Sequence, residues 1–256
     1  MASYFIYDSI NQYRSDNTIT EGQMTDSGTP TFSASDTLTS HERSSDQNIG
    51  TVLSGVADRD AIEYAVGSSV TADAAAVYFT GDDGVASGTI MTFFIDTDRA
   101  SLPSKGTISA VSASGWAVTD LTETTGTKFF TEFNASVSNV SEVLIGKKLA
   151  FEVEPDVNVQ STIDYNNEIN RSLGGVEYSI NVNPGQEVIT ISFQNISSTF
   201  KANLITMQDA LRGESKKFLY NDSSSFHWVR LDKPMTFTEI ADGRFSTQLV
   251  LRQQIQ

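Results

Sequence analysis

Three short apolar runs follow one another closely: Ile62-Glu-Tyr-Ala-Val66, Ala74-Ala-Ala-Val-Tyr-Phe79 and Thr89-Ile-Met-Thr-Phe-Phe-Ile95. Each run has the length of a strand and is rich in aromatic or β-branched residues, so each predicts a β-strand. The segment Gly81-Asp-Asp-Gly84 separates the second run from the third. Its residues tolerate positive φ and hydrogen-bond to their own backbone, so we expect a hairpin or a tight crossover there.

The same rhythm of short apolar runs and polar turns continues to residue 153. Further strand candidates are Trp116–Val118, Lys128–Phe133, Val143–Ile145 and Leu149–Val153. Together with the first three they make about seven strands, enough for a β-sandwich or barrel. Pro155 then interrupts the pattern, because proline cannot donate to a strand ladder and restricts the residue before it.

These patterns divide the chain into three segments. Residues 1–60 are predicted to be a polar N-terminal arm with a few short strands, since residues 8–50 are rich in Ser, Thr, Asp and Asn. Residues 61–156 are predicted to form the β-sandwich. Residues 157–256 are predicted to form a smaller β-rich domain with one helix. The predicted fold class is therefore mainly β.

The helix is expected near residues 198–212. Its apolar residues recur at helical spacing: Phe200, Leu204, Met207 and Leu211. Ser197 or Ser198 can cap its start, and Gly213 can close its end. Strands are predicted on both sides of it, at Glu187–Phe193, Lys217–Tyr220, Phe226–Leu231 and Arg244–Arg252. In the first, we expect the face with Ile189, Ile191 and Phe193 to be buried. In the last, Phe245, Leu249 and Leu251 alternate with Ser246, Gln248 and Arg252.

Composition excludes several classes of function. The 256 residues contain no cysteine, so neither disulfides nor thiolate metal sites are expected. The net charge of -15 disfavours nucleic-acid binding, because few cations are present to neutralise phosphates. The first residues do not resemble a secretion signal, and no run is long enough to span a membrane. We therefore expect a soluble protein made in a cytosol and not inserted into a membrane.

Catalytic and metal-binding signatures are weak. The two histidines, His41 and His227, lack paired-ligand spacing and are read as solvent-facing or packed side chains. No phosphate-binding glycine loop or nucleophile elbow is present. The acidic groups Asp58-Arg-Asp60 and Asp82-Asp83, the latter with Asp96 and Asp98 nearby, lack the ligand spacing and terminal Glu of a calcium-binding hand loop. We therefore predict no enzyme activity, no catalytic residue, no metal and no cofactor.

Carbohydrate binding is a separate possibility. A sugar-binding face would use exposed aromatic residues, for which Trp116, Tyr64 and Tyr78 are candidates, although aromatic residues in strands more often belong to the core. A polysaccharide-degrading enzyme would need two carboxylates across a cleft, and the sequence does not place such a pair. Asn134, Asn139 and Asn195 begin glycosylation acceptor patterns, which mean little without a secretion signal.

The order of several motifs resembles the tail-tip proteins of tailed bacteriophages, of the distal-tail or minor-tail kind. The resemblance covers roughly residues 70–256. It begins with Thr71-Ala-Asp-Ala-Ala-Ala-Val-Tyr-Phe79, continues through Lys128-Phe-Phe-Thr-Glu-Phe133 and Glu142-Val-Leu-Ile-Gly146, and exits at Pro155-Asp156. It ends with Leu249-Val-Leu-Arg-Gln253, where the family often has Glu at the last position. The strand, helix and strands between residues 188 and 252 are similar to the ring-forming part of such proteins.

This resemblance implies a jelly-roll-like β-sandwich followed by a ring-forming domain. The chain would be a structural subunit of the virion, located in the tail and assembled in the host bacterial cytoplasm. The resemblance implies a ring of copies of the chain, with six subunits expected, that would link the tail tube to tip or adhesion machinery. Its other partners would be tail-tip hub proteins and host-surface glycans. The alternatives are a carbohydrate-binding adhesion module of the tail, a tail-tube protein or a capsid-decoration protein.

Overall fold

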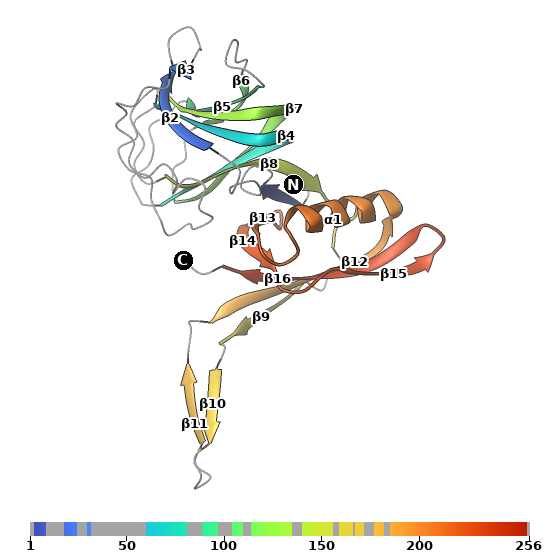
Figure 1. Ribbon diagram of the computed structural model, residues 1–256. Helices are drawn as coiled ribbons and strands as arrows, with labels where there is room; N and C mark the ends of the chain where they lie inside the picture. Colours follow the sequence, from blue (N-terminus) through green and yellow to red (C-terminus); the bar gives the residue numbers. More distant parts are fainter. Residues whose placement is uncertain are drawn as a thin grey trace. The chain divides into compact units, whose positions relative to one another are not determined.

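The computed structural model describes residues 3–8, 18–24, 30–31, 60–80, 89–96, 104–109, 114–134, 140–155, 159–165, 167–171, 177–181 and 185–254. Most of them lie in β-strands, and the described part of the chain contains one α-helix (Figure 1). The predicted mainly β fold is therefore confirmed. The chain divides into two compact units: a sandwich unit with Phe5–Leu149, and a helix unit with Met1–Tyr4 and Ala150–Ile255.

The strands before residue 150 are β1 (Tyr4–Asp8), β2 (Thr18–Met24), β3 (Pro30–Thr31), β4 (Asp60–Phe79), β5 (Thr89–Asp96), β6 (Ser104–Ser109), β7 (Gly115–Phe133) and β8 (Val140–Ala150). Five of them follow the order β6-β5-β7-β4-β8 in an antiparallel sheet. From the predicted arm, β2 adds to the first part of β4. The arm therefore contributes a strand to the sheet of the sandwich unit.

Several predicted strand boundaries are wrong, because the chain uses fewer and longer strands. The runs at residues 62–66 and 74–79 belong to one strand, β4, and those at 116–118 and 128–133 belong to β7. The register between β4 and β7 shifts after Ala65 and again after Ala72. Such bulges let a strand bend without ending, so the polar Gly67-Ser-Ser69 segment interrupts the apolar pattern but not the strand. The predicted strand at 149–153 is absent, because β8 ends at Ala150.

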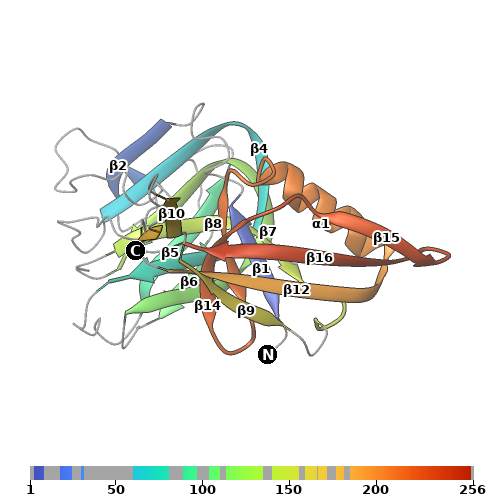
Figure 2. The same cartoon turned by 90° about the horizontal axis from the view of Figure 1, so that it is seen from below.

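The long strands supply most of the core of the sandwich unit. Figure 2 shows β4 as one long, curved strand. One buried cluster contains Tyr64 and Val66 from its first part and Ala75, Val77 and Phe79 from its second part. Strands β5, β6, β7 and β8 add the rest of this cluster. Both parts of the bent strand β4 therefore contribute side chains to the core. For this reason five strands form a core for which the sequence predicted about seven.

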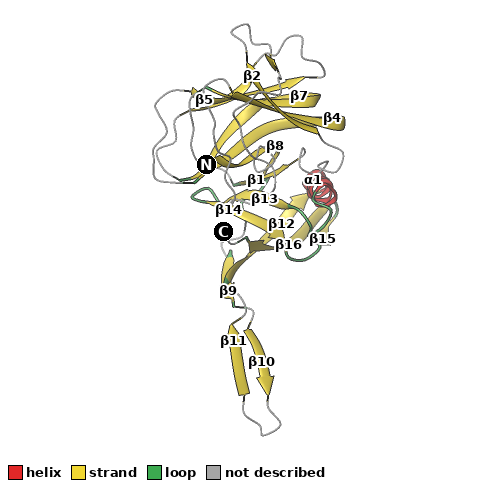
Figure 3. Ribbon diagram, turned by 60° about the vertical axis from the view of Figure 1, so that its left-hand side comes forward, coloured by secondary structure: helices red, strands yellow, loops and turns green. Residues whose placement is uncertain are grey.

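The helix unit contains β9 (Gln160–Asp164), β10 (Asn167–Arg171), β11 (Glu177–Asn181), β12 (Gln186–Ser197), α1 (Ser198–Ala210), β13 (Lys217–Asn221), β14 (Phe226–Leu231), β15 (Thr236–Ala241) and β16 (Arg244–Gln253). Its sheet has the order β13-β14-β16-β12-β9, with β15 also paired to β16 (Figure 3). Strands β10 and β11 pair with each other as a separate ribbon. No helix in the described residues is long and apolar enough to cross a bilayer.

Helix α1 confirms the helical pattern of the sequence. Its inward residues Phe200, Leu204 and Met207 are buried, as is Leu211 just after it. The Ser197 hydroxyl accepts a hydrogen bond from the Phe200 amide at 3.1 Å and caps the first turn. At the other end, Gly213 has a φ of +68° and donates its amide to the Gln208 carbonyl at 2.9 Å. Both predicted caps are therefore present.

The helix packs on the predicted apolar faces of β12 and β16. Ile189, Ile191 and Phe193 of β12 are buried, and so are Leu249 and Leu251 of β16. The Nζ atom of Lys201 on α1 lies 3.8 Å from the centre of the Phe245 ring. This cation–π contact joins the first turn of the helix to β16.

Candidate functional site

The three aromatic candidates for sugar binding lie in different environments. Tyr64 is only 2% exposed and belongs to the core of the sandwich unit. Tyr78 of β4 and Trp116 of β7 are direct cross-strand partners, and both are half-buried. Their ring centres are 5.2 Å apart, and the rings are tilted by 56°. The structure therefore brings two of the three candidates together at a partly open surface.

Polar groups border this aromatic pair. On its other side, Tyr78 lies opposite Glu142 of β8, whose side chain is buried. The half-exposed Thr80 follows Tyr78 by two residues, and its hydroxyl accepts a hydrogen bond from Ser141 at 3.4 Å. The surface therefore combines two ring faces with the Thr80 hydroxyl, while the Glu142 carboxyl group lies buried beneath it.

The second candidate site surrounds His227 in the helix unit. Strands β13 and β14 form a hairpin in which Tyr220 pairs with His227 across the strands. In the turn, one oxygen of Asp222 accepts hydrogen bonds from the Ser224 amide at 2.8 Å and the Ser225 amide at 2.6 Å. The other oxygen lies 3.2 Å from Nε2 of His227. The turn therefore holds the Asp222 carboxylate against the histidine.

These contacts shift the pKa of Asp222. Burial alone would raise it, but the hydrogen bonds from Ser224, Ser225 and His227 outweigh burial and lower the pKa to about 2. Asp222 is therefore ionised at neutral pH. Its charge also acts on the neighbouring Tyr220, whose pKa is raised to about 12 by burial first and then by Asp222 and Glu154.

A stack of three rings fixes His227 from the other side. The Tyr220 ring lies 5.7 Å from the His227 ring and 6.1 Å from the Phe151 ring, centre to centre. Phe151 in turn meets Phe193 edge-on at 5.0 Å. The imidazole therefore stands at the rim of an aromatic cluster that continues into the core of the helix unit.

A pocket of about 360 Å³ opens beside this stack. It is lined by Ser3, Glu154, Pro155, Val159, Ser161, Glu187, Ile189, Tyr220, Asp222, Ser223 and His227. Its carboxylates are held in place: Glu154 accepts from the Ser3 amide at 3.2 Å and the Ser3 hydroxyl at 2.9 Å, and Glu187 accepts from the Ser161 hydroxyl. Its volume lies in the usual range of small-molecule sites, about 300–1,000 Å³.

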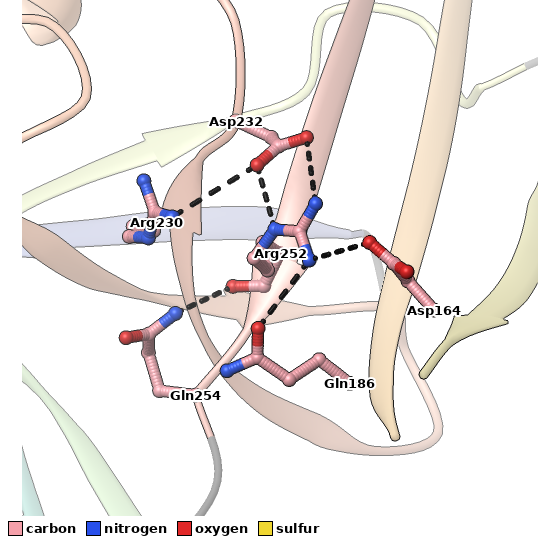
Figure 4. A network of polar contacts seen from close by, with 6 residues as sticks. All are labelled: Asp164, Gln186, Arg230, Asp232, Arg252 and Gln254. Carbon is pink, nitrogen blue, oxygen red and sulfur yellow. Dashed lines mark hydrogen bonds and ion pairs between the residues drawn. The ribbon is translucent and has the colours of Figure 1, made fainter. Parts of the chain in front are cut away.

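Arg252 organises a separate polar network in the helix unit (Figure 4). Its guanidinium donates to Asp232 of the β14 end, to Asp164 of β9 and to Gln186 of β12. The three partners come from segments far apart in the sequence, so the network ties together the β9 side and the β14 side of the sheet. The Arg252 guanidinium uses all three of its nitrogens within the network, which indicates a structural role.

The other acidic, histidine and asparagine candidates fall into two groups: those outside the described residues, and those whose position the structure describes. His41, Asp58, Asp82, Asp83, Asp98 and Asn139 lie outside the described residues. Asp60 is buried in β4, and the backbone of Asp96 pairs with Lys128. Asn134 accepts a hydrogen bond from the Thr92 hydroxyl at 2.7 Å. Asn195 has a φ of +61° at the bulge of β12. Within the described ranges, no three acidic or histidine side chains gather as metal ligands would.

Sequence reasoning missed the pocket, although it named His227. The available signal was the turn Asn221-Asp-Ser-Ser-Ser225 between two aromatic strands, which predicts a hairpin and hence the proximity of Tyr220 to His227. The contributions of Ser3, Glu154 and Glu187 had no such signal, because these residues come from distant parts of the chain.

Comparisons with known proteins give structural matches only. No protein-family model matches the chain, and no curated protein sequence matches it. A family 32 carbohydrate-binding module from Clostridium perfringens, solved with GalNAc-β-1,3-galactose, is 12% identical with a TM-score of 0.38; the match covers 54% of this chain and 98% of the module. A second family 32 module from C. perfringens, solved with galactose, is 12% identical with a TM-score of 0.36, covering 57% and 98%.

A fucose-binding module from Streptococcus pneumoniae is 14% identical with a TM-score of 0.39, and the match covers 55% of this chain and 95% of that module. All three TM-scores lie below 0.5. The similarity by itself therefore assigns neither a family nor a ligand to this chain.

Proposed function

We propose that the chain is a non-catalytic binding protein whose sandwich unit contacts carbohydrate through Tyr78 and Trp116. The observation that carries this proposal is the cross-strand pair itself, two half-buried rings with centres 5.2 Å apart on adjacent strands. Core aromatic residues of this unit, such as Tyr64 and Phe129, are almost fully buried. The open pair therefore differs from the aromatic residues that serve the core.

The chemistry of the pair suits a sugar ring. The face of an aromatic ring carries partial negative charge and attracts the weakly positive C–H groups on the apolar face of a pyranose. Strand pairing fixes both rings on a rigid sheet, so little side-chain freedom is lost on binding. The neighbouring Thr80 hydroxyl can hydrogen-bond to the hydroxyl groups of a sugar.

A glycan array probed with the full chain tests the proposal. We expect the protein to bind a subset of neutral glycans, and the variants Trp116→Ala and Tyr78→Ala to lose roughly tenfold or more in affinity, the effect of removing about 1.4 kcal/mol of ring contact. The matched control is Tyr165→Ala, because Tyr165 is a 50% exposed aromatic residue in the helix unit.

Two outcomes would remove carbohydrate binding as the function. One is an array without signal for the wild-type chain. The other is a Trp116→Ala variant that keeps its fold by circular dichroism and binds as well as the Tyr165→Ala control. A loss of binding that is confined to the two sandwich variants supports the proposal.

The second candidate function is that of a structural subunit in a bacteriophage tail ring. Its support is the outer strand of the helix unit. Among the described strands β9 pairs only with β12, and the large apolar side chains of Ile163, Tyr165 and Val159 are 60%, 50% and 46% exposed. An exposed apolar edge strand is a template for pairing with another copy. Where it pairs with a different edge of the next copy, the contact is head-to-tail and forms a ring when the rotation closes.

Sedimentation of the purified chain at several concentrations tests this second function. We expect an oligomer of defined size that the Ile163→Glu variant converts to monomers. The control is Ile205→Glu on the helix, where the side chain is 40% exposed. A wild-type chain that stays monomeric at the highest concentration, and that does not bind isolated tail tubes, would count against the ring. Carbohydrate binding by the sandwich unit does not depend on this result.

A further inference from the structure

The lining of the pocket in the helix unit mixes charged and apolar side chains. Glu154, Glu187 and Asp222 contribute carboxylates, while Val159, Ile189 and Pro155 contribute aliphatic surface. None of the described residues that line the pocket is Lys or Arg. The hydrogen bonds that hold Glu154 and Glu187 come from Ser3 and Ser161, which are neutral. They orient the carboxylates without cancelling their charge.

The aromatic wall of the pocket is rigid. Tyr220 is 2% exposed and lies between Phe151 and His227, with interplanar angles of 17° and 27°. A buried ring held by two stacking contacts has little rotamer freedom to lose when a ligand arrives. Tyr220 shares the lining with three carboxylates, so the cavity is preformed and carries negative charge.

This combination excludes some ligands and favours others. An anion would be repelled by the carboxylates, and a purely apolar ligand would leave their charges desolvated and uncompensated. A small metal ion would need several oxygens converging on one point, and no such group occurs among the described residues. A ligand with a cationic head and a short aliphatic stem can pair with the carboxylates and also contact the aliphatic residues of the lining.

We infer that this pocket binds an alkylammonium group, with the nitrogen near Glu154, Glu187 and Asp222 and the aliphatic stem against Val159 and Ile189. The site lies in the helix unit and is independent of the aromatic pair in the sandwich unit. The same chemistry occurs in free aliphatic amines and in lysine side chains of a protein partner.

Nuclear magnetic resonance of the full ¹⁵N-labelled chain tests the inference with three probes. They are n-butylamine, its neutral analogue n-butanol, and lysine blocked at both its amino and carboxyl ends. We expect n-butylamine to shift the amide signals of the turn from Asp222 to Ser225, and n-butanol to leave them unchanged. Added salt should weaken the binding of n-butylamine, since salt screens ion pairing.

The blocked lysine distinguishes the two sources of the ammonium group. Binding of n-butylamine without the blocked lysine identifies a small free amine as the ligand. Binding of both identifies a lysine side chain as an admissible ligand. Shifts that are absent with both amines, or equal for n-butylamine and n-butanol, would overturn the inference.

Charge-removing variants locate the site. We expect Glu187→Gln and Glu154→Gln each to weaken n-butylamine binding by roughly three- to fivefold, the effect of one partly exposed ion pair. Both substitutions keep an oxygen to accept the serine hydrogen bond, so the fold should persist. The control is Glu214→Gln, an exposed residue outside the pocket. An equal affinity in all three variants would show that the amine binds elsewhere and would overturn the inference.

Discussion

Arg252 and Asp232 form a two-point ion pair in the helix unit, with Nε 2.7 Å from one carboxylate oxygen and Nη2 3.3 Å from the other. Both side chains are 17% exposed. The hydrogen bond from Arg252 is the main cause that lowers the pKa of Asp232. The geometry uses the fixed fork of the guanidinium, which a lysine ammonium cannot reproduce.

The first prediction is that Arg252→Lys destabilises the chain by about 1–3 kcal/mol. Lysine keeps the charge, but its single ammonium cannot contact Asp232 at two points and reach Asp164 as well. Urea unfolding at pH 7 measures the loss. The control is Arg244→Lys, since Arg244 is 48% exposed and lies 3.9 Å from Glu152. Equal losses in the two variants would show that the fork geometry is unimportant.

The second prediction concerns pH. Because the folded pKa of Asp222 is about 2, below the ordinary value of 3.8, its charge stabilises the fold above the ordinary pKa. This contribution is lost as the pH falls through about 2. We expect Asp222→Asn to cost about 1–2 kcal/mol at pH 7, a figure reduced for partial exposure of the carboxylate, and nothing below the folded pKa.

Urea unfolding of the wild type and Asp222→Asn from pH 7 down to the acid limit checks the sign. The two stability curves should converge on the acid side. Asp242→Asn, at an exposed turn position, serves as the control. A stability gap between wild type and Asp222→Asn that stays constant at all pH values would contradict the assignment of the stabilisation to the carboxylate charge.

How far the sequence predicts the structure differs between the two units. In the helix unit, Phe200, Leu204, Met207 and Leu211 recur with one helical period between two capping signals, and both caps exist as expected. Local signals suffice there because helix hydrogen bonds join residues that are close in sequence. In the sandwich unit, Gly67-Ser-Ser69 carries a turn composition, yet it lies within β4, whose parts before and after it both pair with β7. Strand continuity is set by distant partners, which composition does not report.

The candidate sites also show that local contacts can be predicted from the sequence and that contacts between distant segments cannot. Tyr78 and Trp116 were recognisable as aromatic strand residues, but their pairing depends on the register of β4 against β7. The Tyr220–His227 contact could be predicted from the sequence, since one short turn joins their strands. The pocket could not be predicted, because Ser3 and Glu154 are separated by 151 positions and meet only in the folded chain.

The third prediction concerns a close approach between β6 and β7. A Cβ atom added at Gly106 would lie 2.6 Å from Cδ2 of Leu121 and 2.9 Å from the Asp120 carbonyl oxygen. The backbone oxygen cannot move as a side chain can, so we expect Gly106→Ala to cost about 1–3 kcal/mol. Thermal unfolding measures this cost, and Thr107→Ala, at the exposed neighbouring position, is the control.

A second substitution separates the two contacts. Leu121→Ala in the Gly106→Ala background removes the side-chain clash but leaves the clash with the Asp120 backbone. We therefore expect the double variant to remain less stable than Leu121→Ala alone. Full equality of these two variants would show that only the Leu121 side chain restricts this position.

The fourth prediction tests how the helix unit is held together. Leu204 is fully buried beneath α1, whereas its neighbour Ile205 is 40% exposed. Truncating Leu204 leaves a cavity between the helix and the sheet, so Leu204→Ala should cost about 2–5 kcal/mol. Ile205→Ala should change stability by less than about 0.5 kcal/mol, because it removes little buried surface and alanine favours helices.

Urea unfolding followed by circular dichroism and by tryptophan fluorescence distinguishes the two variants. Trp116 lies in the sandwich unit and Trp228 in the helix unit, so single Trp→Phe backgrounds report on each unit separately. We expect Leu204→Ala to lower the transition reported by Trp228 more than that reported by Trp116. Equal shifts in both would mean that the two units unfold as one cooperative body, and equal effects of Leu204→Ala and Ile205→Ala would contradict the packing of α1 on β12 and β16.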